Sequence, residues 1–363
     1  MTLLLAWVLG GQMTLGRIDP ALALPLLPLP ALGLVWWQRR DPMVARWRTA
    51  GTTLGMLLAA QAALALFLSA RPPWLQLGFI AAGWVIALLA ASLLFTGNRG
   101  KVVALLLGAI FVSGWFAGSH ALLSMLYRPA SAAGPPVTML TGLPLRWSDG
   151  RDLAAMLAQG TNDDPILARL QAAGSVRLVD SIVDDPPSPV GALLLAHPRA
   201  LAPREMVAVD AFVRKGGRAV VLADALSGWP MRYPIGDPRN PPVTSLLTPL
   251  LDHWGVVLAA VSPDDRHVVT VETERARLRL FSAGRFERLP PACRAFADRH
   301  VARCSIGDGE VWLVGDADLL FAPLWQPEPS WAAHLRKADT VEWLGARLWR
   351  DAPPAILQPL WIR

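Results

Sequence analysis

The sequence predicts an α-helical, multi-pass membrane region followed by an α/β domain with a doubly wound, mostly parallel sheet. Two observations predict this division. Apolar runs long enough to cross a bilayer are confined to residues 1–128, and most charged side chains follow them. Beyond residue 136, short apolar segments alternate with helix-like ones, which is typical of a parallel sheet covered by helices.

Charge is distributed unevenly along the 363 residues. Residues 1–127 contain eight basic and two acidic side chains and therefore carry the whole net charge of +6. The remaining residues hold 26 basic and 26 acidic side chains and are neutral. A nucleic-acid-binding protein would gather its basic excess in the soluble part. We therefore expect the lipid bilayer, and no nucleic acid, as a partner of the basic region.

Three apolar runs are long enough for membrane-spanning helices, which need about 20 residues each. They cover residues 50–70, 75–96 and 102–127. One or two further helices are expected within residues 3–37. The run at 21–37 is interrupted by prolines, which kink or delay a helix, and the run at 3–15 is short for a span. No Lys or Arg precedes this first stretch, so we do not expect a cleaved secretion signal.

Basic residues in the short loops predict the orientation of these helices. Two loops, after residue 37 and before residue 102, contain six of them: Arg39, Arg40, Arg46, Arg48, Arg99 and Lys101. The alternate loops contain two, Arg17 and Arg71. The richer loops should be cytoplasmic. The last helix then leaves the cytoplasm, so we expect residues 129–363 on the extracytoplasmic (periplasmic) side of the inner membrane.

A linker of small residues and prolines at 129–136 separates the membrane region from the α/β domain, expected at 137–350, and residues 351–363 form a C-terminal tail. Strands of the main sheet are expected at 137–140, 176–179, 192–196, 219–223 and 311–314. Helices are expected between 149 and 173, at 203–215 and from about 334 to 349, and a further helix is expected to end near 254. Residues 267–273 and 277–281 alternate apolar and polar side chains and predict an added antiparallel hairpin.

Five ordered segments of the soluble part carry a family resemblance. They are PVTMLTGLPL (136–145), ALLLAHPRALAPREMVAVDAFVRKGGRAVVLAD (192–224), LLDHWGVVL (250–258), VWLVGDADLL (311–320) and ADTVEWL (338–344). Together they resemble the extracytoplasmic domain of GldG-like proteins, the auxiliary components of gliding-motility-type ABC transport systems. The resemblance implies a class I glutamine-amidotransferase-like fold that works beside a separately encoded ABC ATPase and permease. The multi-helix N-terminus is larger than a single anchor, which is a departure from that family.

Sequence motifs for ATP hydrolysis and for covalent catalysis are missing. Residues 97–102 have the wrong spacing for a Walker A motif and lack its final Ser or Thr. The ends of two predicted strands and the turns after them read LAHPRAL (195–201) and LADALSG (222–228), and neither contains a cysteine. Ser227 lies in no G-x-S-x-G motif. We therefore expect a protein that is not an enzyme, with no catalytic residue, metal or cofactor.

Four polar side chains follow predicted strands and are the candidate ligand-binding residues. His197 follows the strand at 192–196, Asp224 the strand at 219–223, and Asp316 and Asp318 the strand at 311–314. Open α/β sheets bind ligands at the carboxyl edge of their strands, so these side chains are candidates to line a crevice for a metal or a polar ligand. Strand-terminal aspartates also cap helices and turns, which is the structural alternative.

The two cysteines, Cys293 and Cys304, are separated by ten residues that can form a turn. Disulfides persist outside the cytoplasm, so we expect these two to be paired. Two buried free thiols are the alternative, and a zinc site lacks further ligands.

The sequence favours a non-catalytic, membrane-anchored auxiliary component of an ABC-type transport system, whose extracytoplasmic domain binds a partner or a substrate. The alternatives are an extracytoplasmic enzyme of amidotransferase or hydrolase fold and a structural protein of the cell envelope. The missing nucleophile disfavours the enzyme. A neighbouring ATPase and permease would disfavour the structural protein.

Overall fold

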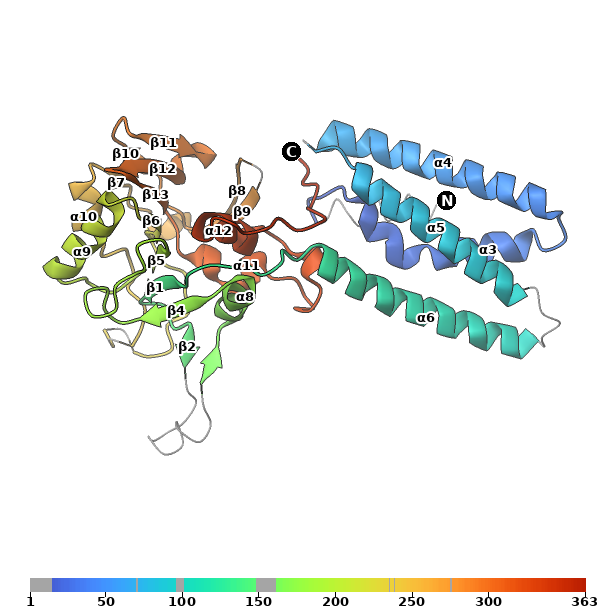
Figure 1. Ribbon diagram of the computed structural model, residues 1–363, viewed down its shortest axis with the longest axis horizontal. Helices are drawn as coiled ribbons and strands as arrows, with labels where there is room; N and C mark the ends of the chain where they lie inside the picture. Colours follow the sequence, from blue (N-terminus) through green and yellow to red (C-terminus); the bar gives the residue numbers. More distant parts are fainter. Residues whose placement is uncertain are drawn as a thin grey trace. The chain divides into compact units, whose positions relative to one another are not determined.

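The computed structural model describes residues 15–69, 71–95, 101–147, 161–234, 236–237, 239–274 and 276–363. The chain divides into two compact units, drawn in Figure 1. The helical unit comprises Met1–Arg128, Pro327–Leu335 and Ala355–Arg363, and the α/β unit comprises Pro129–Gln326 and Arg336–Pro354.

The helical unit contains two C-terminal segments that the sequence analysis assigned to the α/β domain and the tail. Backbone hydrogen bonds explain their place, because the amide of Leu357 donates to the carbonyl of Leu126 at 2.9 Å and that of Arg363 to Leu68 at 3.0 Å. Side chains contribute as well, since Leu357 and Leu360 are fully buried among the apolar residues of this unit. The end of the chain is therefore part of the helical core.

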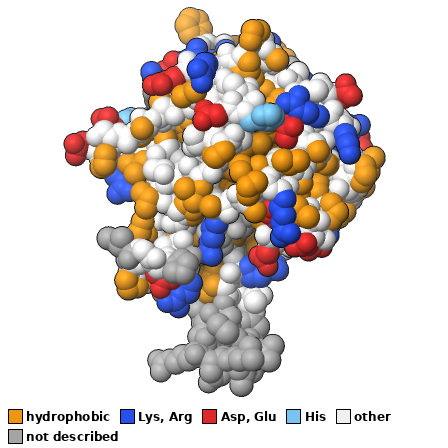
Figure 2. Space-filling view, turned by 90° about the vertical axis from the view of Figure 1, so that its left-hand side faces the viewer, with side chains coloured by type: hydrophobic (Ala, Val, Ile, Leu, Met, Phe, Trp, Pro, Cys, Tyr) orange, Lys and Arg blue, Asp and Glu red, His pale blue; other side chains and the backbone are white. Residues whose placement is uncertain are grey.

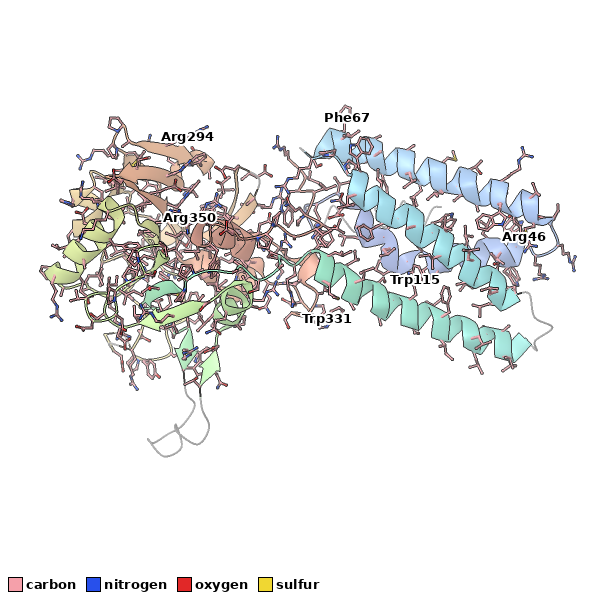
Figure 3. The ribbon with its side chains drawn as sticks, viewed as in Figure 1. Arg46, Phe67, Trp115, Arg294, Trp331 and Arg350 are labelled. Atoms are coloured by element: carbon pink, nitrogen blue, oxygen red, sulfur yellow. A yellow bond between two sulfur atoms is a disulfide. The ribbon has the colours of Figure 1, made fainter. Side chains whose placement is uncertain are left out.

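Three helices of this unit are long and apolar enough to cross a membrane, as the sequence predicts. They are α4 (Met43–Leu68), α5 (Trp74–Phe95) and α6 (Lys101–Leu126). In Figure 3, Arg46 and Phe67 mark opposite ends of α4. The helix begins earlier than predicted, so Arg46 lies in its first turn. The shorter η2 (Pro20–Leu26) and α3 (Pro28–Trp37) meet at a 56° bend and add a fourth, broken span if they are counted together. The run predicted at 3–15 lies outside the described residues, apart from its last residue.

The bend in the fourth candidate span is stabilised from α5 and α6. Pro25 lies inside η2 and cannot donate a backbone hydrogen bond. Near the bend, the carbonyl of Leu24 accepts both the backbone N–H of Leu27, at 3.3 Å, and the indole N–H of Trp115, at 2.8 Å. Trp115 of α6 is labelled in Figure 3. Gly83 permits the close approach of α5, because a Cβ there would lie 2.4 Å from the Leu24 side chain. Irregular backbone is thus buried within protein, as an apolar environment requires.

The α/β unit is built on a seven-stranded sheet with the order β11-β12-β13-β6-β5-β1-β4. Its strands are β1 (Val137–Thr141), β4 (Val176–Val179), β5 (Ala192–Ala196), β6 (Arg218–Leu222), β11 (Cys293–Phe296), β12 (Val301–Ile306) and β13 (Gly309–Val314). The run from β4 to β13 is parallel, whereas β11 and β12 extend the sheet in antiparallel fashion. Counted along the chain, the parallel strands have the order 2-1-3-4-5, a doubly wound arrangement. The predicted mostly parallel sheet is confirmed.

Helices cover both faces of this sheet. On one face, α8 (Pro165–Ala173) and α12 (Thr340–Leu348) pack over side chains such as Leu194 and Val220. On the other, α9 (Pro203–Arg214) and α10 (Thr248–His253) pack over Leu193 and Val221. Successive strand residues thus enter opposite cores, which explains why the strands are apolar throughout.

Smaller elements surround the main sheet. The predicted hairpin is a separate two-stranded sheet of β8 (Val268–Thr273) and β9 (Ala276–Phe281). Two further pairs join β2 (Arg146–Trp147) to β3 (Asn162–Asp163) and β7 (Val257–Leu258) to β10 (Phe286–Arg288). The remaining short elements are η3 (Pro263–Asp265), η4 (Ala297–Arg299), η5 (Asp318–Leu320), α11 (Ala322–Trp325) and η6 (Ala333–Leu335).

Two of the predicted helices differ from the structure. The helix predicted at 334–349 is confined to Thr340–Leu348, and η6 precedes it as a separate turn that belongs to the helical unit. An ion pair between Arg336 and Asp339, 2.8 Å long and buried, lies in the intervening turn. Of the helices predicted between 149 and 173, only α8 lies in the described part of the chain.

Figure 2 shows one face of the α/β unit, on which acidic and basic side chains are interspersed with apolar ones. This mixture agrees with the equal numbers of acidic and basic residues beyond residue 127.

Candidate functional site

The register between β6 and β13 brings two of the candidate residues together. Leu222 pairs with Val314 at the carboxyl ends of these parallel neighbours. Asp224 and Asp316 each follow two residues later, so the chain leaves both strands at the same edge and presents two carboxylates there. Asp318 begins η5 two residues further on, and the turn directs it back toward them.

The three carboxylates form one compact, buried cluster. One side-chain oxygen from each residue lies within 4.8 Å of the corresponding oxygens of the other two. The exposed fractions of Asp224, Asp316 and Asp318 are 0%, 0% and 1%. The residues predicted to line the carboxyl edge therefore converge, but beneath the surface, where a charge is expensive unless it is paired.

Hydrogen-bond donors fix the orientation of Asp316 and Asp318. Asp316 accepts the backbone N–H of Phe281 at 2.8 Å on one oxygen and that of Asp318 at 2.7 Å on the other. Asp318 accepts the hydroxyl of Ser227 at 3.2 Å and the backbone N–H of Gly228. Donors therefore come from the turn after β6 and from the β8–β9 hairpin, so the cluster links three parts of the unit.

Asp224 accepts fewer well-aligned hydrogen bonds than Asp316 and Asp318 do. Its Oδ1 accepts the backbone N–H of Leu226 at 3.1 Å. Its Oδ2 is buried and has no partner with hydrogen-bond geometry among the described residues, although the Ala317 amide and the Ser227 hydroxyl lie near enough to the carboxyl group to lower its pKa. A buried carboxylate oxygen normally has a partner, because desolvation without one costs about 1–3 kcal/mol or more.

Burial and mutual repulsion control the protonation of the cluster. Burial raises the pKa of Asp318 to about 6. Burial, followed by the repulsion of neighbouring carboxylates, raises the pKa values of Asp224 and Asp316 well above their usual range. Arg266 opposes this effect at Asp318, and its guanidinium donates to the carbonyl of Ser227 at 3.1 Å.

His197 lies at the same edge of the sheet but outside the acidic cluster. It follows β5, and its backbone is in the left-handed region at φ 48°. Its Nε2 lies 2.7 Å from the carbonyl oxygen of Pro242, and its backbone carbonyl accepts the N–H of Gly142 after β1. Burial lowers the pKa of His197. The ring is therefore a neutral, buried group that supports the β1 and β5 strand ends.

The turn at Ser227–Gly228 completes the cluster, and the sequence analysis gave it no role there. Gly228 is required for close packing, since a Cβ would lie 2.3 Å from the Phe281 ring and 3.0 Å from an Asp318 carboxylate oxygen. Arg266 lies just before the hairpin and Phe281 ends it, roughly 45 and 60 residues beyond the end of β6. No local pattern connects these positions, because only the fold brings the hairpin over the strand ends.

The two cysteines form a disulfide in the antiparallel part of the sheet. Cys293 of β11 pairs directly with Cys304 of β12, with their Cα atoms 4.0 Å apart. The bond fastens the edge strand β11 to its neighbour. It does not lie in the acidic cluster.

Comparison with known proteins gives one informative similarity. Residues 135–277 match a family described as an ABC-type uncharacterized transport system. The matched segment includes His197 and Asp224 but ends before Asp316 and Asp318. The match supports an auxiliary role associated with ABC transport for the α/β unit.

Solved structures show only remote similarity. An exo-β-1,4-mannosidase from Opitutaceae bacterium strain TAV5 is 10% identical at a TM-score of 0.34, covering 73% of this chain and 49% of the enzyme. β-Galactosidases from Rahnella sp. R3 and Bacillus circulans sp. alkalophilus are 14% and 12% identical, at TM-scores of 0.29 and 0.28. They cover 69% and 58% of this chain, and 35% and 33% of the respective enzymes. The chain thus spans half or less of these enzymes, and likenesses at such TM-scores carry no argument about activity. No curated protein matches the chain.

Proposed function

We propose that this protein is a membrane-anchored, non-catalytic auxiliary component of an ABC-type transport system, of the GldG-like kind. The observation that carries this proposal is the match of residues 135–277 to the ABC-associated family, on a chain that also has three helices able to cross a membrane. The α/β unit binds a partner or a substrate of the system. A separately encoded ATPase and permease supply the energy and the pathway.

The proposed location of the α/β unit is extracytoplasmic. Six basic residues in two loops against two in the alternate loops favour this orientation. The disulfide between Cys293 and Cys304 gives independent support, because such bonds persist in oxidising compartments.

The non-catalytic role is supported by the surroundings of Ser227, the serine that lies beside the acidic cluster. Ser227 donates its hydroxyl to Asp318, and its backbone amide donates to the carbonyl of Val243. A serine nucleophile requires a histidine or comparable base that accepts its proton. His197 directs its Nε2 to Pro242 instead.

Purification of the full chain in mild detergent tests the partnership. We expect an ABC ATPase to be recovered with it through a permease. An unrelated multi-pass protein with the same tag, expressed at the same level, is the control. Repeated recovery of this chain without an ATPase, while the control behaves identically, contradicts the proposal.

Reporter fusions after Arg363 test the orientation separately. A reporter that is active only in the periplasm should be active, and one that fluoresces only in the cytoplasm should be dark. The reverse pattern would show that the topology is inverted. A fusion after residue 40, in the predicted cytoplasmic loop, should give the opposite result within the same experiment.

A further inference from the structure

We propose that Asp224, Asp316 and Asp318 bind a hard divalent cation, with Ca²⁺ as the preferred ion. The site lies at the carboxyl edge of β6 and β13, inside the α/β unit. It is independent of the proposed transport function, because it is argued only from the geometry of these three side chains and their neighbours.

The first argument is the spacing of the oxygens. One oxygen from each residue lies within 4.8 Å of the other two. Ca²⁺ bonds to oxygen at about 2.3–2.6 Å, so two oxygens on opposite sides of one ion are separated by up to about 5 Å. A single ion can therefore contact all three carboxylates without a large movement of the backbone.

The second argument is the unpartnered oxygen of Asp224. Asp224 is completely buried, and its Oδ2 has no partner with hydrogen-bond geometry among the described residues, the Ala317 amide and Ser227 hydroxyl being close to the carboxyl group but not aligned with this oxygen. The other oxygens accept N–H or O–H donors from Leu226, Phe281, Asp318, Ser227 and Gly228. The cluster is thus oriented by donors, yet one acceptor remains unused. A bound cation would supply its missing partner.

The third argument is charge. Three carboxylates occupy the cluster, and among the described residues the charge of Arg266 acts on Asp318. That guanidinium is bonded to the carbonyl of Ser227 and lies on an exposed residue. Each remaining buried negative charge must be paired or protonated. A divalent cation would neutralise the excess at once.

The donor set selects the class of ion. All three ligands are carboxylate oxygens, which suit Ca²⁺, Mg²⁺ and Mn²⁺ rather than softer metals. Zinc sites use cysteine or histidine, but Cys293 and Cys304 are joined to each other and His197 bonds to Pro242. Mg²⁺ demands near-ideal octahedral geometry and retains several waters, which a fully buried cluster does not favour. Ca²⁺ tolerates irregular geometry and is therefore preferred.

A cation here would bind together three parts of the unit. Asp224 follows β6, Asp316 follows β13, and the Asp316 carboxylate also accepts the Phe281 amide of the hairpin. The ion would stabilise the folded state through mass action, since the unfolded chain cannot assemble the ligands. Shared protons are the alternative means of neutralising the cluster, and they predict no response to cations.

The experiment uses the full chain in detergent, dialysed against EDTA and then against chelator-free buffer at pH 7.5. Thermal unfolding is followed during separate titrations with CaCl₂, MgCl₂ and MnCl₂, and bound metal is counted after equilibrium dialysis. For the wild type we expect one bound Ca²⁺ and a rise in Tm of about 5–10 °C at a hundred times the Kd. Weaker rises are expected for the other two ions.

Two variants and one control make the result specific. Asp224→Asn and Asp318→Asn should each weaken Ca²⁺ binding at least tenfold and remove most of the rise in Tm. Without added ion, Asp224→Asn should melt at or above the wild-type temperature, because it removes a buried charge. Asp184→Asn, which changes an exposed aspartate outside the cluster, should behave like the wild type.

The proposal fails if none of the three ions raises the wild-type Tm, since the cluster is then neutralised by protons. It also fails if the Asn variants respond as the wild type does, because the ion then binds elsewhere. A response that is present in the wild type and Asp184→Asn but absent from both cluster variants supports it.

Discussion

Breaking the disulfide should lower the free energy of unfolding of the α/β unit. Two perturbations separate the contribution of the covalent bond from that of the buried sulfur atoms. The first perturbation is reduction of the wild-type chain, which opens the Cys293–Cys304 bond and leaves both side chains in place. The second is the double variant Cys293→Ala with Cys304→Ala. Reduction removes only the covalent restraint, whereas the double variant also removes two sulfur atoms.

The expected magnitudes follow from the loop and from burial. The bond closes a loop across a sequence separation of 11. Restricting the unfolded chain by such a loop is worth about 3 kcal/mol. Cys304 is 1% exposed and packs in the core between the sheet and α9, so truncating it adds about 1 kcal/mol. Reduction should therefore cost about 3 kcal/mol and the double variant about 4 kcal/mol.

Urea unfolding of the full chain in detergent measures both values, with tryptophan fluorescence as the probe. Trp312 of β13 reports on this part of the sheet, because its ring lies 5.5 Å from that of Phe296 in β11. A thiol reagent should label no cysteine in the unreduced chain and two after unfolding in reductant. The reasoning is refuted if reduction changes the free energy of unfolding by less than about 0.5 kcal/mol, or if both cysteines are labelled without reductant.

Three further predictions concern the glycines, the acidic cluster and the helical unit. Gly309→Ala should lower the free energy of unfolding by about 3 kcal/mol, because the new Cβ would lie 2.0 Å from the Val213 carbonyl oxygen. Gly345→Ala in α12 should raise it by up to about 1 kcal/mol, because the nearest atom, in the Trp349 ring, is 4.0 Å away. Urea unfolding measures both changes. In EDTA, the α/β unit should lose stability as pH rises from about 4 through about 6. The pKa of Asp318 is about 6 in the folded state, which therefore retains a proton that the unfolded chain releases. Asp318→Asn should flatten this part of the plot of Tm against pH. Burial lowers the pKa of His334 to about 3, so the helical unit should be most stable above about pH 6.5 and lose stability as pH falls below it. The same titration of His334→Gln should show a smaller loss.

Much of the fold follows from local sequence patterns. The apolar segments at 137–140, 176–179 and 192–196 lie within strands of the observed sheet, because continuous apolar runs are what a sheet covered on both faces requires. The hairpin followed from alternation between apolar and polar residues. The return of residues 327–335 and 355–363 to the helical unit had no such signal, since it depends on packing between segments far apart in the sequence.

The site was only partly predictable for the same reason. Aspartates after two apolar strands indicated the carboxyl edge of a sheet. That these two strands are neighbours, paired from Arg218 to Leu222, could not be seen across the long insertion between them. His197 follows an equally apolar strand, but β5 lies on the far side of β6 from β13. Strand order therefore decides which polar ends meet, and a single sequence does not contain that order in any local pattern.

Arg17, which the orientation rule counts as a loop residue, is part of a buried polar cluster in the folded helical unit. Its side chain is completely buried and its guanidinium bonds to Asp19 at 2.7 Å and to the carbonyl of His334. Asp19 also accepts the hydroxyl of Tyr127. An arginine neutralised in this way contributes no free charge to its loop. The orientation rule counts basic residues whether or not an acidic neighbour neutralises them, so the count of six against two, and the proposed extracytoplasmic placement that rests on it, stay as the sequence gives them.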